Sequence, residues 1–181
     1  MMRSAALTGF ALLMLGLSAG ARAAAAHVNF VDPEHFTDLG RQGDDKDVAA
    51  RRAEIARHIE ELAGPNLPAD QTLDVDVLDI RLAGEDERWP YALQDAPLTT
   101  RVTRPFAGDI RVARIGTWPR IKLRYQLKQG DQVVASGEES VADMKYLDRA
   151  NSYPSDDTLR YEKQLLDDWF QRRLVQHQPA R

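Results

Sequence analysis

The chain has 181 residues, with 24 lysines and arginines against 28 aspartates and glutamates, and it contains no cysteine. The absence of cysteine excludes disulfides, thiolate nucleophiles, cysteine-based zinc sites and iron–sulfur clusters. The excess of acidic residues argues against nucleic acid as a partner, because surfaces that bind nucleic acid are basic.

The first 23 residues have the three parts of a secretory signal peptide. Residues 1–3 carry one positive charge, residues 5–19 are mostly apolar, and Ala21-Arg22-Ala23 fits the A-x-A pattern that signal peptidase reads. The apolar run is shorter than the roughly 20 residues that a membrane-spanning helix needs. We therefore expect residues 1–23 to be cleaved, after Ala23 or after Ala26. Residues 24–181 should then form a single domain, periplasmic or secreted, with no stable membrane anchor.

A strand and a helix are predicted next along the chain. Residues 27–31 alternate in polarity and predict a short strand that ends at Asp32-Pro33. Residues 44–63 predict a helix with acidic residues at its start, and Gly64-Pro65 predicts its end. The helix should bury one apolar face, formed by Val48, Ile55, Ile59 and Leu62.

Residues 73–82 predict a strand with an irregularity in its middle. Apolar and polar residues alternate from Leu73 to Val77, and the alternation then slips by one residue at Leu78. Such a slip turns every later side chain to the opposite face unless the strand contains a β-bulge. We favour a bulge near Val77-Leu78; a second half that covers a different neighbour is the alternative.

The rest of the chain predicts more strands and a closing helix. Residues 84–105 are rich in proline and charge and predict a long irregular connection. Residues 109–115 predict a strand, residues 120–140 a hairpin with its turn at 129–132, and residues 155–176 a helix. This order predicts an α+β fold, with a mostly antiparallel twisted sheet of about four to five strands and two main helices packed on one face.

The sequence offers little support for an enzyme. It contains no G-x-S-x-G, S-x-x-K or H-E-x-x-H motif and no phosphate-binding loop. We assign no catalytic residue and expect no cofactor. One cluster could hold a cation through carboxylate oxygens and an imidazole. The alternative function is therefore a metal-dependent hydrolase that uses this cluster, Asp32, Glu34, His35 and Asp38.

Two tryptophans stand directly before prolines, in Trp89-Pro90-Tyr91 and Trp118-Pro119-Arg120. Proline favours extended geometry in the preceding residue, which can present an indole at the surface. Tryptophan, tyrosine and arginine are also the residues that dominate recognition surfaces. We therefore name Trp89, Tyr91, Trp118 and Arg120 as candidate binding residues. The alternative is that each tryptophan closes one end of the sheet.

These observations favour a non-enzymatic binding or envelope-associated module over an enzyme. Its expected partner is an envelope protein or peptide, bound through the sheet face or the loop that contains Trp89. A structural envelope factor without any ligand is a third possibility that the sequence leaves open.

Three parts of the chain resemble a family of secreted proteobacterial proteins, the domain of unknown function 3016 family. They are residues 28–38, residues 119–125 with 137–139, and residues 153–170. The resemblance implies an exported single-domain protein and transfers no catalytic residue. The residues that carry it include Asp32, Pro33, Glu34, Tyr153, Pro154, Arg160, Tyr161, Glu162, Lys163, Trp169 and Phe170.

Overall fold

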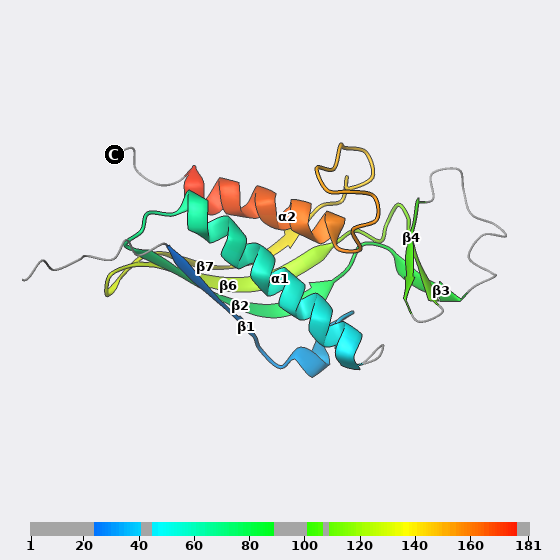
Figure 1. Cartoon of the computed structure of the whole chain (residues 1–181), viewed down its shortest axis with the longest axis horizontal. Coiled ribbons are helices and arrows are strands. Elements are labelled where there is room, and N and C mark those ends of the chain that lie inside the picture. Colours follow the sequence, from blue (N-terminus) through cyan, green and yellow to red (C-terminus); the bar gives the residue numbers. More distant parts are fainter. Residues whose placement is uncertain (1–23, 41–44, 89–100, 107–108, 177–181) are drawn as a thin grey trace, which may run out of the picture.

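The structure is a computed structural model that describes residues 24–40, 45–88, 101–106 and 109–176 (Figure 1). Its main sheet has four strands in the order β1-β2-β6-β7. The strands β1 and β2 are parallel, and the other two pairs are antiparallel. The bounds of the strands are β1 (Ala25–Phe30), β2 (Gln71–Arg81), β6 (Arg120–Gln129) and β7 (Gln132–Ala142).

Two helices, α1 (Asp45–Asn66) and α2 (Arg160–Phe170), cover one face of this sheet (Figure 1). A short π-helical segment, η3 (Gln171–Val175), continues α2, and a 3-10 turn, η1 (Pro33–His35), follows β1. The predicted α+β class, with a mostly antiparallel sheet and two helices on one face, is confirmed. No helix in the described ranges is long and apolar enough to cross a membrane.

The predicted bulge and hairpin are both present. The pairing of β2 with β6 shifts between Val77 and Asp79, so that Leu78 is the extra residue and Ile80 returns to the buried face. The strands β6 and β7 are joined through Gly130, whose φ of 58° is a left-handed conformation that glycine adopts without strain.

Both predicted helix boundaries are wrong by a few residues. The helix α1 continues past Gly64-Pro65, because the amide of Leu67 still donates to the carbonyl of Ala63 (3.0 Å) and Leu67 is buried. The helix α2 begins at Arg160 and not at residue 155. The preceding residues form turns, in which the carboxylate of Asp157 accepts a hydrogen bond from the Leu159 amide (2.8 Å).

The predicted irregular connection over residues 84–105 is wrong at both of its ends. A second sheet, of order β3-β5-β4, is formed by β3 (Glu85–Arg88), β4 (Arg101–Phe106) and β5 (Asp109–Ala113). Charged residues make up the whole of β3, so the sequence carries no apolar alternation there. Gly84, directly before β3, has a φ of +84°, and a Cβ atom at this position would lie 2.6 Å from the carbonyl oxygen of Val112.

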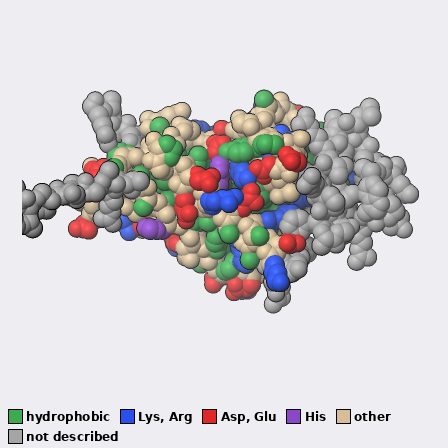
Figure 2. All heavy atoms as spheres, in the orientation of Figure 1, with side chains coloured by type: hydrophobic (Ala, Val, Ile, Leu, Met, Phe, Trp, Pro, Cys, Tyr) green, Lys and Arg blue, Asp and Glu red, His purple; other side chains and the backbone are tan. Residues whose placement is uncertain are grey.

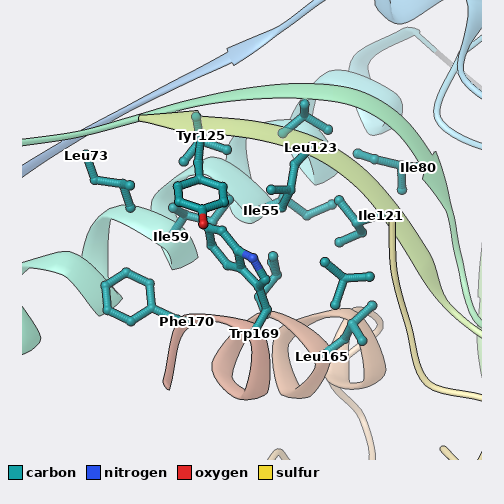
Figure 3. Close-up of a cluster of buried hydrophobic side chains, with 14 of the residues drawn as sticks. Ile55, Ile59, Leu73, Ile80, Ile121, Leu123, Tyr125, Leu165, Trp169 and Phe170 are labelled. Carbon is teal, nitrogen blue, oxygen red and sulfur yellow. The ribbon is translucent and has the colours of Figure 1, made fainter. Parts of the chain in front are cut away.

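The core lies between the helices and the four-stranded sheet. Trp169 and Phe170 of α2 are fully buried there and lie against Tyr125, Ile55 and Ile59 (Figure 3). The rings of Tyr125 and Trp169 meet edge to face at 5.6 Å. Burial of aromatic rings of this size is a major stabilising contribution, and it fixes the position of the end of α2 relative to β6.

Candidate functional site

Of the four predicted binding residues, the structure describes Trp118 and Arg120. Trp118 is half-buried and packs against a small cluster that contains Ala83, Ala113, Tyr146 and Tyr161. Arg120 lies 3.6 Å from a carboxylate oxygen of Asp79 in an ion pair. Trp89 and Tyr91 lie outside the described residues. Part of the Trp118 indole is therefore packed against the protein, and the charge of Arg120 is paired with Asp79.

The predicted metal cluster does not form a site. The carboxylate of Asp38 is directed toward the end of β2, where it accepts hydrogen bonds from the Leu82 amide (2.7 Å) and Arg111 (2.9 Å). Glu34 and His35 contact each other at 3.5 Å on the exposed surface. In the described part of the chain, no group of three or more such side chains could hold a metal ion. The carboxylate of Asp38 is thus engaged with Leu82 and Arg111, whereas Glu34 and His35 contact each other.

The residues that carry the family resemblance lie mostly in packed positions on α2. Tyr161 is buried against Tyr146 with ring centroids 4.8 Å apart. Arg160 is also buried, and its guanidinium lies 5.3 Å from the centre of the Tyr161 ring. These side chains fasten the start of α2 to the loops around it.

Glu162 is a buried carboxylate at the centre of this region. Its Oε1 accepts a hydrogen bond from the amide of Ala83 (2.6 Å), and its Oε2 has no hydrogen-bond partner in the described residues. Burial raises the pKa of Glu162 to about 7, while the Ala83 amide and the charges of Arg111 and Arg51 act to lower it. A carboxylate in such surroundings is held near the midpoint of its titration at neutral pH.

A polar cluster joins α1 to α2 on the helix-covered side of the molecule. His58 Nε2 lies 2.8 Å from Asp167 Oδ1, and the hydroxyl of Tyr153 donates to Asp167 Oδ2 (2.7 Å). Burial, followed by the hydrogen bond to Asp167, raises the pKa of Tyr153. Figure 2 shows the same mixture of acidic and basic side chains at the centre of this face.

Lys163 extends the cluster by bonding to two carboxylates, those of Glu54 (2.5 Å) and Asp157 (2.6 Å). Burial acts to lower the pKa of Lys163, but these hydrogen bonds outweigh it and the pKa is raised. A histidine–aspartate pair activates a nucleophile only when a serine or a similar group stands within hydrogen-bond reach. His58 and Asp167 bond to each other and to the hydroxyl of Tyr153, so this cluster joins α1, α2 and the loop that precedes α2.

A groove of about 470 Å³ lies between β7 and the end of α2. Arg173 crosses it and binds the carboxylate of Glu139 at 2.8 Å. The indole N–H of Trp169 has no acceptor in the described residues. A π-helical turn forms one wall, and such turns are frequent at functional sites. The groove is lined by Glu139, Ser140, Val141, Ala142, Trp169, Arg172, Arg173 and Gln176.

Tyr125 lies close to this groove because β7 carries a glycine opposite it. A Cβ atom on Gly137 would lie only 3.1 Å from the Tyr125 ring, so the ring rests directly on the backbone of β7. Burial raises the pKa of Tyr125; the negative charge of Glu139 adds to this, and Arg173 opposes it. An aromatic ring and two arginines are therefore placed along the same side of β7.

The strand β7 is an edge of the main sheet, because no other strand in the described ranges pairs with it besides β6. It is 11 residues long, and most of its residues are at least partly exposed, including Val133 and Val134. An edge strand offers unpaired backbone groups to a further strand unless charges, prolines or a covering element protect it. Glu138 and Glu139 are the only charged residues of β7, so protection by charge is limited to that position.

The uncovered face of the main sheet is less suited to a ligand. Its charges are matched across neighbouring strands, with Arg124 bound to Asp76 (2.7 Å), Lys128 to Asp74 (2.6 Å) and Lys122 to Glu138 (2.9 Å). The hydrogen bond from Arg124 lowers the pKa of Asp76. A charged partner would have to break these pairs, so this face is typical of a solvated surface.

The sequence did not predict the groove, and it named Glu162 only as one of the residues that carry the family resemblance. The groove joins residues 139–142 to residues 169–176, which are far apart in the chain. The spacing of residues does indicate that Glu162 is buried, because it lies three residues after Leu159 and four before Leu166, on the apolar face of α2.

A family model supplies the relationship to known proteins. It carries the description "Protein of unknown function (DUF3016)" and matches residues 24–172, nearly all of the described chain. No curated protein and no solved structure matches the chain. The resemblance predicted from the sequence is confirmed: the chain belongs to the DUF3016 family of proteins of unknown function.

Proposed function

We propose that the protein is exported to the periplasm and acts there as a non-enzymatic binding module. Its ligand is an extended segment of an envelope protein, which adds to the sheet beside β7. The observation that carries the proposal is the long edge strand with a groove next to it. In this mode of recognition, backbone hydrogen bonds along the edge supply affinity, and neighbouring side-chain pockets supply specificity.

The groove favours a ligand segment that carries a carboxylate. Arg172 and Arg173 line it against the single acid Glu139, so the groove itself has a net positive charge although the whole chain is acidic. Arginine binds carboxylates through two parallel hydrogen bonds, and such charged hydrogen bonds are among the stronger ones. An acidic side chain of the ligand would therefore compete with Glu139 for Arg173.

A photo-crosslinking amino acid placed at Gln176 of the exported full chain tests this proposal. Gln176 is exposed and lines the groove, whereas Gln126 is also exposed but lies on the uncovered face of the central strand β6. We expect a discrete crosslinked product from position 176 in the periplasmic fraction and none from position 126. Crosslinks from position 126 alone would move the binding site to the sheet face and overturn the proposal.

Charge reversal of Arg173 provides the second arm of the test. Arg173→Glu should lower the crosslinking yield at position 176 by roughly tenfold, which corresponds to the loss of one charge-assisted hydrogen bond. Arg57→Glu is the matched control, since Arg57 is an exposed arginine of α1 that pairs only with Glu61 at 3.6 Å in the described ranges. Equal losses for the two variants would show that the groove arginine has no specific role.

A further inference from the structure

A second hollow, of about 590 Å³, lies where β1 begins. Two of its lining side chains are the carboxylates of Asp70 and Asp131, and none of the described residues that line it is a lysine or an arginine. Asp70 already accepts a hydrogen bond from the side chain of Gln129 (2.6 Å). The lining residues are Ala25, Ala69, Asp70, Gln71, Thr72, Gly130 and Asp131.

The strand β1 is fully paired from its first residue. Ala25 lies opposite Thr72 and Ala26 opposite Leu73, in the parallel register that continues to Phe30. Ala24 and Ala26 are partly buried and pack against the main core. The first residues after the proposed signal peptide are therefore part of the folded domain.

This geometry distinguishes between the two cleavage positions that the sequence left open. Cleavage after Ala26 would remove the first two pairs of β1 and two side chains that pack on the core. Cleavage after Ala23 would keep the whole strand. It would also create a positively charged amino group on Ala24, next to Ala25 and the acidic hollow, where a positive charge is favoured.

We infer that signal peptidase cleaves after Ala23 and that the mature protein begins at Ala24, with its α-ammonium group beside Asp70 and Asp131. The inference rests on the proposed export. The cleavage position then matches the fold, because the new N-terminal residue, Ala24, directly precedes Ala25, the first paired residue of β1.

Intact-mass measurement of the periplasmic protein, produced from the full precursor in a Gram-negative host, tests this inference. The expected mass is that of residues 24–181. A mass that corresponds to residues 27–181 would overturn the inference while the proposed export stands. An uncleaved chain that stays in the cytoplasm would instead overturn the export proposal and the inference with it.

Two matched substitutions sharpen the result. Signal peptidase reads small residues at the last and third-last positions before the cut. Ala21→Leu therefore blocks cleavage after Ala23 only, and Ala24→Leu blocks cleavage after Ala26 only. We expect Ala21→Leu to cause a loss of the product that begins at position 24, and Ala24→Leu to leave that start unchanged. The reverse pattern would contradict cleavage after Ala23.

Discussion

The free energy of unfolding of the native protein is expected to fall as the pH rises from about 4.5 to about 7, and replacing Glu162 by glutamine should abolish this fall. Glu162 is buried, and burial raises its pKa from 4.5 to about 7 in the folded protein. Glutamine keeps the shape of the side chain and the acceptor for the Ala83 amide, which lies 2.6 Å from Oε1. It cannot ionise, so its contribution does not change with pH.

The direction of the effect follows from the number of protons bound. Below pH 4.5 the carboxyl group is protonated in both the folded and the unfolded chain. Between pH 4.5 and 7 the folded chain retains a proton that the unfolded chain has released, so each rise in pH favours unfolding. The stabilisation is complete below pH 4.5 and is lost by about pH 7. The difference in pKa corresponds to about 3 kcal/mol.

Urea unfolding of the native chain and of Glu162→Gln from pH 4 to pH 8 would measure this difference. The free energy of unfolding of the native chain should fall relative to the variant by about 3 kcal/mol across the window. Glu60→Gln, on the exposed side of α1, serves as the control and should follow the native curve. Parallel curves for the native chain and Glu162→Gln would mean that the pKa of Glu162 is not raised.

The parts of the fold that were predicted correctly are those with a regular period. The alternation on either side of Leu78 indicated the bulge, and the alternation from Ile121 to Leu127 indicated the hairpin, because a strand with one buried face repeats every two residues. The strand β3 has no apolar residue to alternate. Its position depends on Gly84 and on pairing with β5, and neither of these leaves a local pattern.

The site could not be predicted for a related reason. Asp38 was predicted as a cation ligand from its neighbours in the sequence, whereas its partners are Leu82 and Arg111, 44 and 73 residues away. Likewise, the sequence does not distinguish Arg172 and Arg173 from other polar residues at the end of a helix. Only the packing of Trp169 against Tyr125 brings that helix end next to β7 and makes the arginines part of a groove.

The pair of Arg111 and Asp38 should be among the most costly to disrupt in the molecule. Arg111 is 7% exposed, and its guanidinium donates to the carbonyls of Leu82 (3.2 Å), Ala83 (2.8 Å) and Gly84 (2.9 Å) besides Asp38. Arg111→Met leaves three carbonyls and a carboxylate without this donor. We expect a loss of about 3–5 kcal/mol in the free energy of unfolding, as is usual when one partner of a buried ion pair is removed.

A double-mutant cycle would separate the ion pair from the carbonyl contacts. Asp38→Asn keeps an acceptor for the Leu82 amide and removes only the charge, so it should cost less than Arg111→Met. Because the two side chains touch, the coupling energy should be about 1–3 kcal/mol. The pair Arg120 and Asp79, 3.6 Å apart and more exposed, is the matched comparison and should couple by less than about 1 kcal/mol.

The comparison decides what Asp38 does in this protein. A large coupling at Asp38 and a small one at Asp79 would mean that the turn after β1 is held to β5 through Arg111, where the two sheets meet. Equal couplings would mean that the charge of Asp38 contributes no more through Arg111 than an exposed ion pair does. Because Arg111 bonds to three consecutive carbonyls between β2 and β3, its loss should also loosen the second sheet. Faster amide hydrogen exchange in β5 of Arg111→Met, with unchanged exchange in β6, would reveal such loosening.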